Sequence, residues 1–233
     1  MEITNNLLKR NWFKKATIED VKNEINSGAD VNATNKEGWT PLMFAIQNRC
    51  NAAIIAMLIN AGAKVDIKDK INGMTPLMLA ALCDGTEIIP LLIEHGAEVN
   101  TKDSDGATPL AYALTNNPKA IKILANHGAD INVIDAIGRT LMHKAATQAK
   151  QPEIIKTLVE LGVDINTIGK LDMTPLMTAA MCNENLEIIK TLIEKGADVN
   201  AKNSSGHTVS HFAKNNNNPE VRKFIEQLEK NHD

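Results

Sequence analysis

Two short anchors repeat along the whole chain, and this repetition limits what the chain can fold into. The first anchor reads Gly-x-Thr-Pro-Leu in its full form, and its threonines are spaced by 35, 33, 32, 34 and 34 residues. These threonines are Thr40, Thr75, Thr108, Thr140, Thr174 and Thr208. The second anchor begins with a glycine and lies between them in phase, at Gly28, Gly62, Gly96, Gly128, Gly162 and Gly196. Self-similarity at a period of about 20 to 50 residues is typical of repeat architectures. The 233 residues therefore divide into about seven units rather than one or two globular domains.

The local chemistry of one unit predicts two helices and a turn. Threonine is a good N-cap and proline suits the first helical position, so Thr75 and Pro76 predict a short helix that runs to Leu82. A second apolar segment at helical spacing begins at Ile88 and ends before Gly96, since glycine tolerates the left-handed conformation past a helix end. The polar stretch that follows predicts a β-hairpin or turn.

These residues resemble the ankyrin repeat, whose signature Thr-Pro-Leu-His-x-Ala and period of about 33 residues match closely. The resemblance implies an all-α fold, an ankyrin-repeat solenoid of stacked antiparallel helix pairs with projecting β-hairpin loops. It also implies that residues 1–233 form a single domain. Residues 1–36 form an N-terminal cap repeat, with Leu7 and Phe13 on its first helix, residues 37–204 form five central repeats, and residues 205–233 form a C-terminal cap repeat.

The family prefers histidine three residues after the threonine. Only His143 and His211 match this preference, and Met43, Met78, Ala111 and Met177 occupy equivalent positions. We therefore expect weaker capping of the helix start in these four repeats, offset by flexible methionine packing.

Composition and charge exclude several classes of protein. The formal net charge is −3, which does not favour a nucleic-acid or anionic-membrane partner. No apolar run approaches the roughly 18 residues of a membrane span, and the residues after Met1 do not form a standard secretory signal. Cys50, Cys83 and Cys182 are odd in number and widely spaced, which fits a reducing compartment. We expect a cytoplasmic monomer, with delivery into a host cell by a non-standard route left open.

The motifs of the common enzyme classes are missing, including phosphate-binding loops, H-E-x-x-H and G-x-S-x-G. Four aspartates recur once per repeat after the helix ends, so we interpret them as structural; they are Asp30, Asp130, Asp164 and Asp198. His207 and His211 are four residues apart and could bind a metal if both were helical, but His207 precedes the helix start. We predict no enzyme activity, no cofactor and no metal, with a metal-dependent enzyme using His207 and His211 as a remote alternative.

The resemblance implies that a protein or peptide partner binds to the hairpin tips and to the exposed side of the first helices, along a concave groove. Phase in the repeat maps this surface to Trp39, Phe44, Met74, Leu79, Tyr112, Arg139, Lys144, Met173, Met181 and His207. The chain has only 2 Trp, 1 Tyr and 4 Phe, and aromatic residues often anchor interfaces. Alternatively, residues such as Phe44 fill gaps between helices and Trp39 is a common tip residue.

The hairpin tips also carry apolar side chains, which favour a covering partner. They are Ile67, Ile71, Ile134, Ile137, Ile168 and Leu171. The leading hypothesis is a non-catalytic protein–protein interaction module that acts as an adaptor, an inhibitor or a host-directed effector. The alternative is a structural or self-assembling repeat unit, in which the tip isoleucines pair one molecule with another.

Overall fold

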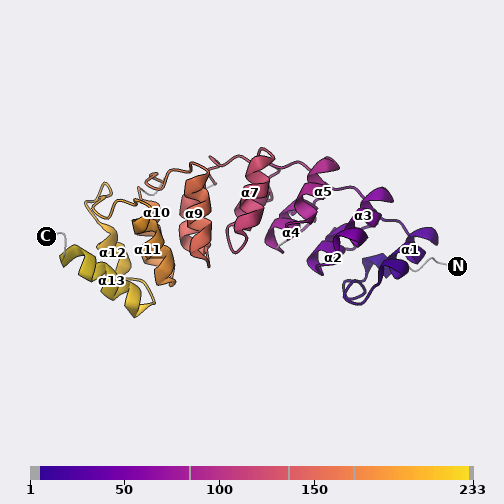
Figure 1. The fold of residues 1–233 in the computed structure, drawn as a ribbon, viewed down its shortest axis with the longest axis horizontal. Helices are drawn as coiled ribbons and strands as arrows, with labels where there is room; N and C mark the ends of the chain where they lie inside the picture. The colour runs from indigo at the N-terminus through magenta and orange to yellow at the C-terminus, as the bar shows by residue number, and fades with distance from the viewer. Residues whose placement is uncertain (1–5, 84, 136, 170–171, 231–233) are drawn as a thin grey trace. The chain divides into compact units, whose positions relative to one another are not determined.

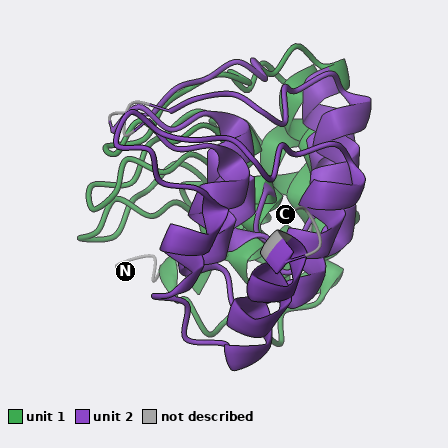
Figure 2. Cartoon of the chain, turned by 90° about the vertical axis from the view of Figure 1, so that its left-hand side faces the viewer, with its two compact units in different colours: residues 1–113, 126–129 green, residues 114–125, 130–233 purple. Residues whose placement is uncertain are grey.

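The chain folds into two compact units (Figure 2). The computed structural model describes residues 6–83, 85–135, 137–169 and 172–230. Unit 1 comprises residues 1–113 and 126–129, and unit 2 comprises residues 114–125 and 130–233. Within the described residues the regular structure is helical, apart from one isolated antiparallel bridge between Ile134 and Thr140. The all-α fold class is confirmed, whereas the grouping into a single domain with two cap repeats stays a prediction.

In unit 1, short first helices stack on one another and second helices pack against them (Figure 1). The first helices are α2 (Pro41–Gln47), α4 (Pro76–Leu82) and α6 (Pro109–Ala113). The second helices are α1 (Ile18–Asn26), α3 (Ala52–Asn60) and α5 (Ile88–Glu94). The N-terminal repeat differs from the expectation. Its first helix is reduced to a 3₁₀ turn, η1 (Asn6–Leu8), followed by turns that still bury Leu7 and Phe13.

Unit 2 repeats the same arrangement. Its first helices are α8 (Leu141–Gln148), α10 (Pro175–Cys182) and α12 (Val209–Ala213), and α10 packs against both of the others. Its second helices are α7 (Pro118–Asn126), whose last residue falls in unit 1, α9 (Pro152–Glu160), α11 (Leu186–Glu194) and α13 (Pro219–Lys230). Each pair of a first and a second helix is joined by a short loop, as in α10 and α11.

The boundaries of these helices follow from the anchors in the sequence. Helix α4 begins at Pro76 and ends at Leu82, as predicted, and the side chain of Thr75 accepts a hydrogen bond from the backbone N–H of Met78. Helix α5 ends at Glu94, and Gly96 adopts a φ of 92°, which a residue with a β-carbon rarely adopts. Helix start and helix end are therefore fixed by the two repeated anchors.

Methionine takes part in the caps where histidine was expected. The sulfur of Met78 lies 3.4 Å from the backbone nitrogen of Thr75, and the sulfur of Met177 lies 3.5 Å from that of Thr174. A thioether is a weak acceptor, so these contacts satisfy the donors less well than an oxygen would.

The expectation of weaker capping is nevertheless wrong for the threonine side chain. Thr40, Thr75 and Thr174 each accept from the N–H of the methionine three residues on. In the repeat with histidine, the Thr140 side chain makes no such bond and instead lies 2.9 Å from His143 Nδ1.

The Asp-x-Asn segments close turns and tie consecutive repeats together. Backbone N–H groups two residues on donate to Asp30, Asp130, Asp164 and Asp198, each at 2.8 Å. In unit 2 the Asn166 side chain also donates to the Gly196 carbonyl and accepts from the Asp198 N–H. The structural interpretation of the four aspartates is confirmed.

Candidate functional site

The residue before each threonine is positioned by a tight turn, one of the two forms that the sequence predicts for this stretch. In the turn before α2, the N–H of Asn35 donates to the carbonyl of Trp39, and the Asn35 side chain accepts from the N–H groups of Glu37 and Trp39. This side chain satisfies the donors that a strand ladder would otherwise use. The same position is occupied by Asp69, Asp103, Asp135, Gly169 and Asn203. Sequence reasoning missed these residues, although an Asp or Asn five or six positions before most threonines was a readable signal.

In unit 1, the candidate residues divide into surface and interior. Trp39 is half-buried and its ring lies 5.3 Å from that of Phe44, centroid to centroid. Phe44, Met74 and Leu79 are buried in the core of the unit. The half-buried indole of Trp39 therefore presents apolar surface to solvent, and the buried ring of Phe44 packs against it.

Tyr112 lies on α6 with its ring half-buried. Its hydroxyl donates to Asp103 Oδ2 at 2.6 Å, and Asp103 Oδ1 accepts from the N–H groups of Asp105 and Ala107. Burial, as the main cause, and the hydrogen bond to Asp103, as the second, raise the pKa of Tyr112 well above its usual value. The hydroxyl is thus hydrogen-bonded to the preceding turn, which leaves the edge of the ring as the part that a partner could contact.

In unit 2, two candidate cations share one carboxylate. Arg139 Nε lies 2.9 Å from Asp135 Oδ2, and Lys144 Nζ lies 3.7 Å from the same oxygen. Burial of Asp135 raises its pKa, but the hydrogen bonds from Arg139 and the charges of Arg139 and Lys144 outweigh this and hold the pKa below its usual value. Arg139 is the more exposed of the two cations, so it is the better placed to meet an anionic group on a partner.

The remaining candidates of unit 2 lie in different environments. Met173 is buried, Met181 is partly exposed on α10, and His207 is partly exposed before α12. Met173 offers its carbonyl oxygen to the buried ring of His143, at 2.7 Å from Nε2. The candidates with accessible surface in this unit are Arg139, Lys144, Met181 and His207.

Four of the six apolar tip residues are exposed. Ile71 is 62% exposed, Ile134 59%, Ile137 52% and Ile168 65%. Ile67 is half-buried, and Leu171 lies outside the described residues. Each exposed isoleucine keeps a large aliphatic surface in water. A partner that covers this surface makes binding more favourable through the hydrophobic effect.

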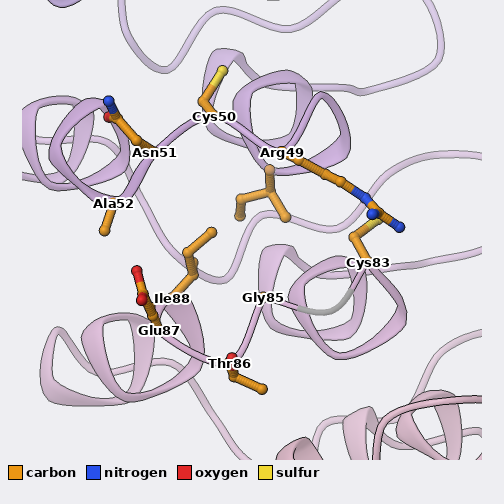
Figure 3. A pocket seen from close by; sticks show the side chains of 10 residues that line it. Arg49, Cys50, Asn51, Ala52, Cys83, Gly85, Thr86, Glu87 and Ile88 are labelled. Atoms are coloured by element: carbon orange, nitrogen blue, oxygen red, sulfur yellow. The ribbon is translucent and has the colours of Figure 1, made fainter.

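A hollow of unit 1 contains two of the three cysteines (Figure 3). It has a volume of about 310 Å³ and lies among Ile46, Arg49, Cys50, Asn51, Ala52, Cys83, Gly85, Thr86, Glu87 and Ile88. Figure 3 shows the Arg49 side chain extending toward Cys83. Burial raises the pKa of both thiols, and the charge of Arg49 partly offsets this for Cys83. Both half-buried thiols are therefore poorer nucleophiles than ordinary cysteines near neutral pH.

We expect Cys182 to be alkylated first, because it is exposed whereas Cys50 and Cys83 are half-buried with raised pKa values. A raised thiol pKa lowers the thiolate fraction at pH 7, so raising the pH to 9 should accelerate the labelling of Cys50 and Cys83. Mass spectrometry of iodoacetamide-labelled peptides at both pH values measures this. In the variant Arg49→Gln, labelling of Cys83 at pH 7 should slow while labelling of Cys182 stays unchanged. Faster labelling of Cys83 in this variant would contradict the assignment.

The two histidines of the metal alternative stack face to face. The ring centroids of His207 and His211 are 3.5 Å apart, with an angle of 5° between the planes, and Phe212 contacts both rings edge-on. Stacked rings direct their nitrogen lone pairs into parallel planes and not toward one common point, as a metal ion requires. In the described part of the chain no three metal-binding side chains come together. No described helix has the length and apolar character needed to cross a membrane.

Comparisons with known proteins agree with this architecture. The family described as "Ankyrin repeats (3 copies)" matches residues 13–103, 51–135, 96–169 and 142–233. The crystal structure of the human ASB11 ankyrin repeat domain superposes with a TM-score of 0.78 at 23% identity, covering 94% of this chain and 96% of that one.

Curated relatives are similar over shorter segments. An ankyrin repeat protein of fowlpox virus (strain NVSL) is 33% identical over 87 residues, which are 37% of this chain and 15% of the viral protein. The RelA-associated inhibitor of Mus musculus is 39% identical over 94 residues, which are 40% of this chain and 11% of that protein. The matches thus span small parts of longer proteins, whereas the family matches together run from residue 13 to residue 233. The chain belongs to the ankyrin repeat family.

Proposed function

We propose that this protein is a non-catalytic interaction module that binds a protein or peptide through its turn tips and the accessible sides of its first helices. The observation that carries the proposal is the group of exposed tip isoleucines, Ile71, Ile134, Ile137 and Ile168. Each unit also places an anchor residue near its tips, Trp39 in unit 1 and Arg139 in unit 2. Aromatic and arginine side chains beside apolar surface are typical of binding energy hot spots.

The comparisons support a binding role in general terms. Ankyrin repeats are generally protein–protein interaction modules, and one relative is named RelA-associated inhibitor. The similarity to a viral protein is compatible with a host-directed effector. An adaptor, an inhibitor and an effector all have to bind a partner, so the binding surface is tested first. A cytoplasmic location and a monomeric state belong to the same proposal.

We expect simultaneous replacement of Trp39, Tyr112 and Arg139 by alanine to abolish capture of the natural partner from a lysate of the source cell. These three side chains are partly exposed on their turns and first helices, so their loss removes contact surface. Crosslink mapping on the wild-type protein should locate the captured chain on the same turns. Capture that is unchanged by the triple variant would refute this surface.

Two controls separate binding from folding in that experiment. Glu94, Lys195 and Asn126 are exposed at the ends of second helices, so their replacement by alanine should leave capture intact. Tyr112→Phe removes the hydrogen bond to Asp103 but keeps the ring. If the ring makes the contact, Tyr112→Phe retains capture, whereas Tyr112→Ala reduces it.

The exposed tips also favour a second candidate, self-assembly of the repeat unit. In that case the tip isoleucines of one molecule would cover those of another. Sedimentation velocity at increasing protein concentration distinguishes the two functions. A monomer at all concentrations supports the binding module, and an oligomer that Ile71→Asp or Ile168→Asp disrupts supports self-assembly.

A further inference from the structure

Two hollows adjoin at the N-terminal end of unit 1, where the segment after η1 meets α2. The first, called the apolar hollow, has a volume of about 270 Å³ and is lined by Arg10, Glu37, Trp39, Phe44, Gln47 and Ile71. The second, called the basic hollow, has a volume of about 410 Å³ and is lined by Arg10, Asn11, Lys14, Gln47 and Asn48. Arg10 and Gln47 line both hollows, so the two hollows are neighbours on the surface of unit 1.

The apolar hollow has one supported wall and one open wall. On the supported side Trp39 lies against Phe44, which is only 3% exposed and so holds the indole in place. On the open side stands Ile71, which is 62% exposed. Aromatic and aliphatic side chains that line the same hollow suit one large apolar side chain from outside.

The basic hollow is fixed to the same helix. The Asn48 side chain donates to the carbonyl of Arg10 at 3.0 Å and to the carbonyl of Phe44 at 2.8 Å. This bridge sets the backbone at Arg10 against α2, and it does not depend on the Arg10 side chain. The Asn48 side chain therefore fixes the backbone at Arg10 relative to α2, and a site that binds two groups of one ligand needs such a fixed support.

The two hollows differ in charge, because Arg10 and Lys14 line the basic hollow whereas Arg10 and Glu37 line the apolar hollow. Lys9, Arg10, Lys14 and Lys15 lie within residues 9–15, a segment without an acidic residue, although the whole chain has a net charge of −3. In the described structure neither Arg10 nor Lys14 takes part in an ion pair, whereas Lys9 donates to Asn6 at 2.7 Å. On the apolar side Glu37 accepts from the Asn35 side chain at 2.9 Å. An anionic group is thus attracted toward Arg10 and Lys14 and repelled from Glu37.

We propose that these two hollows form one site for a peptide segment of a partner protein, with a large apolar residue followed closely by carboxylates. The apolar side chain enters between Trp39 and Ile71, and the carboxylates meet Arg10 and Lys14. An extended chain advances about 3.3 Å per residue, so carboxylates within the next two to four residues can reach the adjoining hollow. This inference rests on the proposed binding function and names the chemistry of the partner. The apolar wall and Glu37 favour a peptide over a phosphate polymer, which would place charge along the whole site.

The test uses synthetic peptides of twelve residues, labelled with fluorescein, and fluorescence anisotropy with the full chain. The acidic probe set carries Trp, Phe, Leu or Ile at a fixed position, followed by three Asp or Glu residues in a Gly/Ser background. A second set replaces the acidic residues with lysine, and a third separates them from the apolar residue by six positions. We expect at least one acidic probe to bind about tenfold more tightly than both matched peptides, with affinity that falls as salt is added.

Variants of exposed residues assign the binding to the two hollows. Arg10→Glu and Lys14→Glu should each weaken the acidic probe about tenfold, and Ile71→Ala should weaken it several-fold. Lys64→Glu is the matched control, because Lys64 is equally exposed in unit 1 but lines neither hollow, and it should change the affinity little. Unfolding curves that coincide with the wild type exclude loss of the fold as the cause.

Three results would overturn the inference. The first is equal affinity for the acidic and the lysine peptides, and the second is an equal effect of Arg10→Glu and Lys64→Glu on the affinity. The third is tighter binding of oligothymidylate, or of vesicles containing phosphatidylserine, with an affinity that Ile71→Ala does not change. Concentration-dependent dimers that Ile71→Asp abolishes would assign the site to a second copy of this chain, which also overturns it. If the peptides fail while capture of a natural partner still requires Trp39, Tyr112 and Arg139, this inference is wrong and the proposed function stands.

Discussion

Replacing Asn183 with alanine is expected to lower the free energy of unfolding by about 3 kcal/mol. Asn183 follows α10, and its side chain is almost fully buried in unit 2. Its amide nitrogen donates to the carbonyls of Ala146 and Ala149, at 2.9 and 3.2 Å, and its oxygen accepts from the N–H of Asn185 at 2.9 Å. Alanine would leave buried polar groups of two repeats without partners, and a buried group that loses its partner has a large free energy cost.

The measurement is urea denaturation followed by circular dichroism, with Asn217→Ala as the matched control. Asn217 is an exposed asparagine that donates to Glu184 across a comparable sequence separation. Because both groups of that pair can bond to water instead, its loss should change stability by less than about 0.5 kcal/mol. Equal losses in the two variants would show that burial of the amide is not what makes Asn183 important.

Asn183 illustrates which features of this fold the sequence reveals and which it does not. Asn216 repeats its role one repeat later and donates to the carbonyls of Ala180 and Asn183. In the sequence, Asn216 lies in the run Asn215 to Asn218, where nothing separates a buried amide from three more exposed neighbours. The distinction depends on which loop backbone lies opposite, and a single sequence carries no record of that contact.

The helices could be predicted because their signals are local. Thr75 and Pro76 fix the start of α4, and Gly96 follows the end of α5, through interactions that reach only a few residues. The N-terminal repeat was predicted less well: Leu7 and Phe13 are buried as apolar residues should be, but the segment lacks the Thr-Pro anchor and forms only the 3₁₀ turn η1.

The candidate surface could be predicted only in part, because phase in the repeat fixes a backbone position but not the depth of a side chain. Trp39 and Leu79 both belong to the mapped set, yet Trp39 is half-buried and Leu79 is buried. Arg10 lies outside the mapped set, because its segment carries no repeat anchor from which a phase could be counted. The basic hollow beside the apolar hollow depends on the hydrogen bond from the Asn48 side chain to the Arg10 carbonyl. This contact joins residues 38 positions apart, which a single sequence does not reveal.

Replacing His143 with alanine is expected to lower the free energy of unfolding of unit 2 by about 3 kcal/mol at pH 8. His143 is 2% exposed, and its Nε2 donates to the Met173 carbonyl at 2.7 Å while its Nδ1 lies 2.9 Å from the Thr140 hydroxyl. One neutral ring therefore joins the cap of α8 to the turn before α10. Alanine would remove both bonds and leave a cavity, as urea denaturation should show.

The contribution of His143 should also depend on pH, because burial lowers its pKa from the ordinary value of 6.5, against the opposing effect of the Met173 hydrogen bond. The unfolded chain then binds a proton more readily than the folded chain, so stability is complete above about pH 6.5 and falls as the pH drops through the lower folded-state pKa. The difference between wild type and His143→Ala should therefore shrink from pH 8 to pH 5. His211→Gln is the control, because His211 is exposed on the stack with His207 and should not remove this dependence. A difference that stays constant with pH would mean that His143 has the same pKa in the folded and the unfolded chain.

The same ring explains why the turn before α10 has glycine where the turns before α4 and α12 have Asp69 and Asn203. A β-carbon on Gly169 would lie 3.1 Å from Nε2 and 3.2 Å from Cε1 of His143, closer than an ordinary contact. Met78 precedes Asp103 and Met177 precedes Asn203 at the equivalent positions, so a flexible methionine accompanies a full side chain in the next turn. Gly169→Asp should therefore destabilise the wild type by about 1 to 2 kcal/mol but cost clearly less in the His143→Met background. If the free energy changes of the two single variants simply add up in the double variant, the His143 ring is not the reason for glycine at position 169.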